Sequence, residues 1–459
     1  MLKNKGIADC RHFRASLWPI GPIRREMTRA SNCGMIQRLF AVRLRLSAIL
    51  LLLLLFSTGG QSAVTVPVVV KVQAGANLSL ITNLLGGTLI DAIPEANTYL
   101  LNLPSLPVLS PTLKLLGVEW LELDRGVSLP ANPPLALLDV PWNAGGDWYK
   151  AQPALQLIRS EAALQYATGR GLIVADINSR IDYGHPALAG HVGAGYDFVA
   201  NRPSAVAALN DDQSTAGFLD DDQSTAGFLD DDQSTAGFLD GNGISLSALG
   251  LTGTGAAGHG TFCAALIAAT APDATIMPLR AFDDNGNSDL FTLAKAIRYA
   301  RRNGAQVLNM SFGTLTDARV LREAIDDARS GNVLLVASAG NNNTSSPQYP
   351  AAYAGVIAVA ATDLLDRKAS FSNYGGYVFV DAPGSHIISA LPDGRYGIAN
   401  GTSFSAPMVA GMAAVLRSLT YTDTAAIIAG SAVPIDNRNP QYSGQLGYGR
   451  IDILDAVQP

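Results

Sequence analysis

The chain has 459 residues, of which 48% are hydrophobic, 15% charged and 7% aromatic, a composition that excludes disordered, collagen-like and coiled-coil proteins. This length allows about two or three domains and at least one large hydrophobic core. The net charge is −6, but residues 1–46 hold ten basic and two acidic side chains, which leaves −14 on the rest and argues against nucleic-acid binding.

The first segment has the order of a secretory signal peptide. Its basic stretch is followed by an uninterrupted apolar run at residues 48–56 and by small residues that end at Ala63. A membrane-spanning helix needs about 20 apolar residues, and arginines interrupt the sequence just before this run. We therefore expect residues 1–63 to be a basic leader and signal peptide. The body is expected to be secreted or periplasmic, with no stable membrane anchor.

The cysteines limit how an exported body could be stabilised. Cys10 and Cys33 lie in the leader, and Cys263 is the third and last cysteine. The body can therefore form no internal disulfide, and packing must hold it together.

Residues 64–130 are expected to form a small α/β unit. Their pattern predicts strands at 66–72, 87–90 and 98–101 and a helix at 77–85. The prolines that follow resist regular structure, so we expect residues 131–152 to be a proline-rich linker.

From residue 153 onward, helical segments alternate with short apolar runs. Helices are predicted at 153–167, 262–270 and 289–303, and strands at 172–175, 306–310 and 332–336. Strands buried on both faces and joined by helices indicate a mostly parallel sheet, so 153–459 is expected to be one α/β domain.

One ten-residue sequence occurs three times without change, at 211–220, 221–230 and 231–240. The units are rich in Asp, Ser and Gly, which favours an exposed insert formed by tandem duplication. A calcium-binding repeat is the alternative, because carboxylates are ligands that calcium prefers.

Ser403 lies in the most informative motif, Gly401-Thr402-Ser403-Phe404-Ser405-Ala406-Pro407, at the start of an apolar helical segment. The free N–H groups of a first helical turn favour negative charge nearby. A serine there can be only a helix cap, unless a base accompanies it.

His259 is the candidate base. It stands between Gly258 and Gly260 ahead of the helical segment at 262–270, and an imidazole titrates near neutral pH. Alone it would more often be structural, but beside a serine motif it favours nucleophilic catalysis.

Two loops at predicted strand ends complete the set. They contain Ser311-Phe312-Gly313 and Ser338-Ala339-Gly340-Asn341. Glycine lets an extended substrate backbone approach, and an asparagine amide can donate to an oxyanion, although both loops are also ordinary turn sequences.

In chain order, the segments at 258–261, 309–313, 338–341 and 401–407 resemble the subtilisin-like serine protease family (peptidase S8), over roughly residues 150–457. The resemblance implies a subtilisin-like three-layer α/β fold with a mostly parallel sheet, plus a small α+β propeptide-like domain at 64–130. It implies an endopeptidase with polypeptide substrates and its own propeptide-like domain as partners.

Carried over by position, Ser403 is the nucleophile, His259 the base and Asn341 the oxyanion donor. The substrate-binding residues are Ser311, Phe312, Gly313, Ser338, Ala339 and Gly340. Glycine at 340 suggests an open pocket for a sizeable apolar side chain. No cofactor is required for the chemistry; structural calcium is possible by resemblance, but its ligands are unknown.

The acidic member of the family's triad is replaced. Counting back from His185-Pro186 places Asn178 at that position, whereas Asp176 lies two residues upstream, about 6–7 Å away along a strand. A shifted register that uses Asp176 is the alternative. An asparagine holds an imidazole less well in its charged form, and the loss in turnover is roughly 10⁴-fold in serine proteases.

Two other functions stay open at this point. A secreted pseudoprotease that binds peptides would fit Asn178. A lipase or esterase is disfavoured because no Gly-x-Ser-x-Gly sequence surrounds Ser403.

Overall fold

The computed structural model describes residues 65–130, 136–138, 147–204 and 256–458, apart from residue 422. The predicted leader at 1–63 and the repeats at 211–240 lie outside these residues. No helix of the described ranges is long and apolar enough to cross a membrane.

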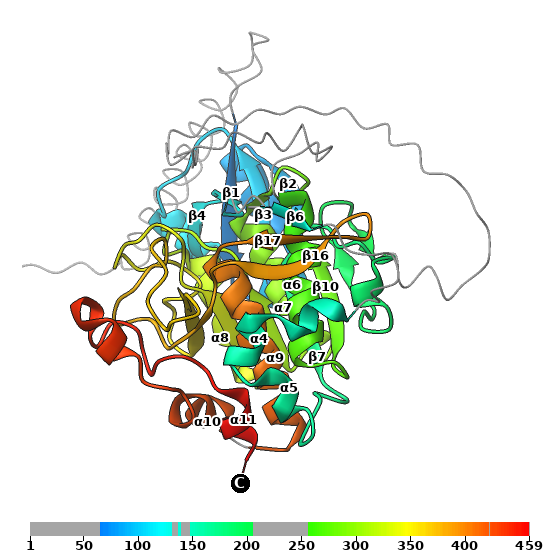
Figure 1. The fold of residues 1–459 in the computed structure, drawn as a ribbon. Helices are drawn as coiled ribbons and strands as arrows, with labels where there is room; N and C mark the ends of the chain where they lie inside the picture. Colours follow the sequence, from blue (N-terminus) through cyan, green and yellow to red (C-terminus); the bar gives the residue numbers. More distant parts are fainter. Residues whose placement is uncertain (1–64, 131–135, 139–146, 205–255, 422, 459) are drawn as a thin grey trace, which may run out of the picture. The chain divides into compact units, whose positions relative to one another are not determined.

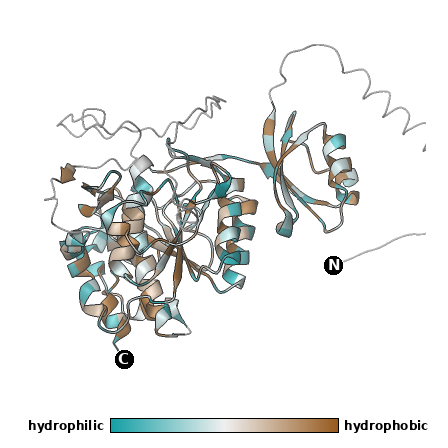
Figure 2. Cartoon of the chain, turned by 90° about the vertical axis from the view of Figure 1, so that its right-hand side faces the viewer, coloured by the Kyte–Doolittle hydropathy of each residue, from teal (hydrophilic) through white to brown (hydrophobic). Residues whose placement is uncertain are grey.

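Residues 65–130, here called the N-terminal unit, form an antiparallel sheet with helices on one face (Figures 1 and 2). The strands, in the order β2-β3-β1-β4, are β1 (Val66–Val72), β2 (Thr88–Ile93), β3 (Thr98–Leu103) and β4 (Val118–Leu123); the helices are α2 (Leu78–Leu85) and α3 (Pro111–Leu115). Side chains alternate along β1, so Val68 and Val70 pack with α2 and α3, while Val69 packs with helices of the body.

Two elements of this unit, β4 and α3, are not predicted from the sequence. The helix α3 begins at Pro111, and proline is tolerated there because the first N–H of a helix has no helical partner. Ser110 caps this helix by accepting a hydrogen bond from the Leu113 N–H at 3.3 Å. A proline-rich sequence therefore does not exclude regular structure here.

The body, residues 147–458, is built on an eight-stranded sheet in the order β15-β14-β13-β12-β7-β10-β8-β9. All neighbouring strands are parallel except β8 and β9. The strands are β7 (Ile173–Asn178), β8 (Tyr196–Asp197), β9 (Arg202–Pro203), β10 (Thr275–Arg280), β12 (Val307–Met310), β13 (Leu334–Ser338), β14 (Val356–Thr362) and β15 (Val380–Pro383). Central strands such as β13 and β14 are almost entirely apolar and buried, as a sheet covered on both faces requires, whereas the short edge strands β8 and β9 are polar.

Helices cover both faces of this sheet, which makes the expected three layers. On one face lie α6 (Ala256–Thr270) and α9 (Thr402–Ser418), and on the other α7 (Leu290–Arg302) and α8 (Arg319–Ser330). Val174 of β7 belongs to the core beneath α6 and α9, and Ala175 to the core beneath α7 and α8.

Carboxyl groups of the N-terminal unit cap two of these helices. Glu122 accepts hydrogen bonds from the first two N–H groups of α8, at 3.0 and 2.7 Å, and Asp124 accepts one from the Phe291 N–H of α7 at 3.0 Å. The residue before α8 is Ala318, whose side chain cannot cap. The N-terminal unit therefore supplies a charge that the positive end of α8 lacks in its own sequence.

The chain between the two parts pairs with strands of the body. Strand β5 (Gly126–Ser128) pairs with β11 (Asn287–Asp289), and β6 (Ala136–Leu138) adds to the hairpin of β16 (Ile387–Leu391) and β17 (Arg395–Ala399). The expectation that 131–152 resists regular structure is thus wrong for β6 and for the 3-10 helix Trp148–Ala151. Other 3-10 turns are Pro94–Ala96, Pro186–Leu188, Asp436–Arg438 and Pro440–Tyr442.

The predicted helix at 153–167 is broken in two. It forms α4 (Pro153–Leu157) and α5 (Ser160–Ala163), separated by Arg159 in the left-handed conformation with φ 53°. The Arg159 Nε donates to both carboxylate oxygens of Asp452 at 2.8 Å, just before α11 (Ile453–Val457). The remaining helix, α10 (Thr424–Gly430), precedes α11 in the C-terminal segment.

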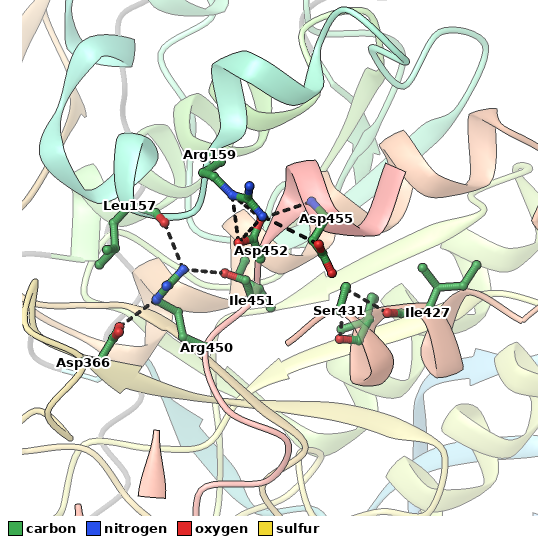
Figure 3. A network of polar contacts seen from close by, with 10 residues as sticks. Leu157, Arg159, Asp366, Ile427, Ser431, Arg450, Ile451, Asp452 and Asp455 are labelled. Atoms are coloured by element: carbon green, nitrogen blue, oxygen red, sulfur yellow. Dashed lines mark hydrogen bonds and ion pairs between the residues drawn. The ribbon is translucent and has the colours of Figure 1, made fainter. Parts of the chain in front are cut away.

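Arg450 extends this contact between the two ends of the body (Figure 3). Its guanidinium donates to the Leu157 carbonyl at 2.9 Å and to Asp366 at 2.7 Å, and its side chain is 8% exposed. The break in the helix therefore places Arg159 and the Leu157 carbonyl where the C-terminal segment can bind them.

Candidate active site

Asn178 and His259 are in direct contact. Asn178 is the last residue of β7, and its Oδ1 lies 2.7 Å from His259 Nδ1 on α6. An amide oxygen only accepts, so Nδ1 must carry the proton. The Ser179 N–H also donates to Asn178 Oδ1 at 2.9 Å, which fixes the orientation of the amide. Asn178, and not Asp176, therefore faces the imidazole.

The other nitrogen of His259 is available to act as a base. Nε2 is buried and has no hydrogen-bond partner among the described residues. Burial lowers the pKa of His259 to about 4, so the ring is neutral at pH 7. The sequence places His259 ahead of a helix, whereas it lies within α6, which begins three residues earlier at Ala256.

Ser403 is buried in the first turn of α9, and neighbouring contacts bring that turn to His259. The ring of Phe404 lies 5.6 Å from the imidazole, centroid to centroid. Ser403 Oγ donates to the Ser311 carbonyl at 3.3 Å, and Ser311 Oγ donates to the Ser403 carbonyl at 2.9 Å. The long bond to Ser311 leaves Oγ weakly held, as a group that must turn toward a base requires.

Asn341 is held by its carbonyl oxygen. Asn341 Oδ1 accepts from the Thr402 N–H at 2.9 Å and from Thr402 Oγ1 at 2.7 Å. Because the oxygen end of the amide faces Thr402, the donor end is directed elsewhere. This arrangement ties the amide to the residue next to Ser403, where an oxyanion would form.

The two predicted substrate walls differ in what their side chains do. Phe312 is fully buried and packs on Phe282, with centroids 5.4 Å apart, so only the backbone of this segment can face a substrate. Ser338 and Ala339 are also buried, whereas Gly340 has φ +109°, a conformation that side chains rarely adopt.

Gln348 narrows the space beside Gly340. A Cβ built on Gly340 would lie 1.7 Å from Gln348 Oε1, and one on Gly313 would lie 2.6 Å from Gln348 Nε2. The amide thus lies between the two walls, and the expected opening for a large apolar side chain is wrong at this depth. No sequence signal marks Gln348, because it lies in a loop without a motif.

The N-terminal unit sends an extended segment toward this site. Beyond β5, the Leu129 N–H donates to the Gly286 carbonyl at 2.8 Å, and Leu129 packs in one cluster with Ala256. Ala256 is three residues before His259 on α6. The chain therefore binds to the body as an added strand close to the candidate base.

Clusters of acidic, histidine and cysteine side chains that could bind a metal are expected at no particular position, and the described residues contain none. Among the described residues, no three His, Cys, Asp or Glu side chains are grouped so that they could hold an ion. The Asp-rich repeats at 211–240, the alternative calcium-binding sequence, lie outside the described ranges.

Comparisons with known proteins identify the family of this chain. The profile of the subtilase family (Peptidase S8) matches residues 169–449. Thermitase from Thermoactinomyces vulgaris is 33% identical over 316 residues, covering 66% of this chain and 94% of thermitase. A thermophilic serine proteinase from Bacillus sp. (strain AK1) is 35% identical over 328 residues, 71% of each chain.

A solved structure shows the same fold. Fervidolysin from Fervidobacterium pennivorans, a keratinolytic enzyme related to subtilisin, superposes with a TM-score of 0.65, covering 88% of this chain and 62% of fervidolysin. At 23% sequence identity this likeness concerns the fold alone.

Proposed function

Because this chain belongs to the subtilase family of serine endopeptidases, we propose that it is an exported endopeptidase that uses Ser403 and His259. The observation that carries this proposal is the 2.7 Å contact between Asn178 Oδ1 and His259 Nδ1, because it leaves Nε2 without a proton. A base in this tautomer is what the serine hydroxyl needs.

The reaction follows from these positions. Ser403 Oγ bonds to the carbonyl carbon of a peptide and passes its proton to His259 Nε2. The carbonyl oxygen becomes an anion, which the Asn341 amide and the start of α9 stabilise. The C–N bond then breaks, the leaving amine takes the proton from His259, and water releases the acyl group by the same two steps.

Turnover is expected to be lower than with a carboxylate at position 178. The Asn178 amide orients the imidazole and fixes its tautomer, but it carries no charge to stabilise the imidazolium that forms during attack. A secreted pseudoprotease that binds peptides is the alternative, and Asn178 is the observation that favours it.

We also propose that the N-terminal unit is a propeptide and that the leader directs export. The capping of α8 by Glu122 and the pairing of β5 with β11 support this, because both contacts use groups that the body alone leaves open. A propeptide held this way would guide a polypeptide backbone along the body near His259.

Labelling of Ser403 tests the proposed function. A fluorophosphonate should label the purified parent protein, and the parent should degrade casein and lose the N-terminal unit. Ser403→Ala should abolish labelling, casein cleavage and processing together. Ser405→Ala is the matched control, because Ser405 Oγ donates to the Ala382 and Pro383 carbonyls, at 3.1 Å each.

The result decides between the two functions. A folded parent that neither labels nor cuts casein, but binds casein peptides, would establish the pseudoprotease. Processing that is unchanged in Ser403→Ala would assign removal of the N-terminal unit to another protease.

A further inference from the structure

Asp176 is a buried carboxyl group to which the proposed mechanism gives no role. It lies on β7 two residues before Asn178, so both side chains project from the same face of the strand. The residue is 1% exposed, and no basic side chain in the described ranges forms an ion pair with it. Burying a carboxyl group without a cation is costly, and an apolar residue would fill this strand position more cheaply.

The partners of Asp176 are two amide groups that donate to it. Asn309, its neighbour on β12, donates from Nδ2 to Oδ1 at 2.7 Å, and Asn178 Nδ2 lies 3.3 Å from both carboxylate oxygens. Ionised carboxylates only accept hydrogen bonds, so this pair of donors favours the charged form.

Asn178 therefore links the carboxylate to the imidazole. Its Nδ2 donates to Asp176, while its Oδ1 accepts from His259 Nδ1. A carboxylate bound at the nitrogen end of an amide increases the negative charge on the oxygen end, because hydrogen bonds in series polarise one another. The contact with Asp176 also prevents the amide from flipping, which would present a donor to His259.

We propose that Asp176 is a positioning residue that supplies the negative charge of this site and acts on His259 through the amide of Asn178. The inference rests on the proposed function of Ser403 and His259. The negative charge that the family places against the imidazole lies here two residues earlier on β7, and the Asn178 amide stands between it and the ring.

The groups around Asp176 are neutral, so Asp176 is the charged group among them. It faces Asn178 on its own strand, Asn309 on β12 and Cys263 on α6, and Cys263 Sγ lies 3.8 Å from His259 Nδ1. Burial raises the pKa of the Cys263 thiol well above its ordinary value, so this group stays neutral. Burial raises the pKa of Asp176 to about 6, which leaves it ionised at pH 7 to 8.

Exchanging the two side chains tests the inference. Asp176→Asn should lower kcat on a peptidyl p-nitroanilide by about 10–100-fold with KM unchanged, by analogy with the loss of a group that orients a metal-bound imidazole. It should also shift the acid limb of kcat/KM from near pH 6 to lower pH.

Asn178→Asp alone would place two carboxyls together, and they would share one proton. The double variant should therefore be more active than either single variant.

Asp381→Asn is the matched control. Asp381 is fully buried on β15, four strands from β7 or about 19 Å, and the pKa of its carboxyl is also raised by burial. It should leave kcat and the pH profile unchanged. The inference is overturned if Asp176→Asn behaves like this control, or if the double variant is no faster than Asn178→Asp.

A spectroscopic measurement separates this inference from the proposed function. In the full chain carrying Ser403→Ala, the NMR resonance of the His259 Nδ1 proton should shift as the pH crosses about 6, and adding Asp176→Asn should abolish that shift. This NMR measurement does not depend on turnover, and the titration of the Ser403→Ala chain needs no variant of Asp176. A parent that is inactive but shows the shift contradicts the proposed function alone; an active parent without the shift contradicts the inference alone.

Discussion

Burial, and not a neighbouring charge, keeps His259 neutral at the pH where it would act. Burial alone lowers its pKa to about 4, and the same environment raises the pKa of Asp176 to about 6. Each shift records a cost of holding a charge inside the body. At neutral pH only Asp176 of the two carries a charge, so Asp176 is the residue whose burial lowers the free energy of unfolding there.

Asp176→Asn should stabilise the protein relative to the parent, and this gain in the free energy of unfolding should be larger at neutral pH than at acid pH. The folded parent keeps the Asp176 proton up to about pH 6, whereas the unfolded chain releases it near 3.8. The parent's free energy of unfolding therefore falls as the pH rises through this window, by about 3 kcal/mol. Urea unfolding at pH 3.5 and 7, both chains carrying Ser403→Ala, measures the difference, and an equal slope in both would contradict it.

Gln348→Ala should widen the preference for the side chain before the scissile bond. The Gln348 amide lies between Gly313 and Gly340, and removing it should admit a benzyl group. We expect kcat/KM for phenylalanine relative to alanine at that position to rise by about tenfold. Ser346→Ala, an exposed change in the same loop, is the control; a ratio that moves equally in both variants would place the substrate elsewhere.

The sequence predicts the positions of these side chains better than their surroundings. Counting from His185-Pro186 placed Asn178 against His259, and the structure has that contact. The same count places Asp176 two residues upstream, where it does not reach the ring. The count does not reveal that Asp176 binds the amide that does reach it. Gln348 was missed because a loop brings it to the site from outside every motif.

At the scale of elements, the periodicity of apolar residues predicts the sheet and its covering helices but not their breaks. The pattern at 153–167 is helical throughout, yet the helix stops at Arg159. Tertiary contacts outweigh helix propensity there, because the left-handed turn allows a bidentate bond to Asp452. Such a partner, 293 residues away, is invisible to local sequence analysis.

Arg450→Met should lower the free energy of unfolding by about 2–4 kcal/mol. The substitution leaves Asp366 and the Leu157 carbonyl without their donor in a largely buried place (Figure 3). Arg170→Met is the control, because the Arg170 side chain is 83% exposed and its pair with Asp273 should contribute less than about 1 kcal/mol. Thermal unfolding in the Ser403→Ala background compares them, and similar losses would show that Arg450 does not hold the two ends together.

At the scale of the whole described molecule, the sequence predicts the fold of the N-terminal unit but not its interface with the body. Its strands follow from alternating apolar residues. The interface depends on single side chains, such as Trp120, whose Nε1 donates to Glu323 at 2.7 Å, and Asp91, which pairs with Lys295 at 2.6 Å. Nothing in the local pattern distinguishes such residues from solvated ones, because their partners lie on α7 and α8.

One of these interface groups makes docking of the N-terminal unit sensitive to pH. Asp124 caps α7 beside the carboxyl of Asp289, which itself accepts from the Thr292 N–H at 2.6 Å. Burial and the nearby Asp289 raise the pKa of Asp124 from 3.8 to about 8. Docking therefore takes up a proton, and undocking releases it.

Docking should weaken as the pH rises from about 4 to about 8 and then level off. Each pH unit within this window lowers the docking constant by up to about tenfold, so the change between pH 6 and 8 is at most about 100-fold. Trp120 is buried in the interface, so its fluorescence reports undocking, and its urea midpoint should fall over this range in the Ser403→Ala chain. Asp124→Asn should remove the pH dependence, because an amide still accepts from the Phe291 N–H but does not titrate. Asp91→Asn should weaken docking at every pH and keep the slope, so a slope that persists in Asp124→Asn would assign the titration to another group.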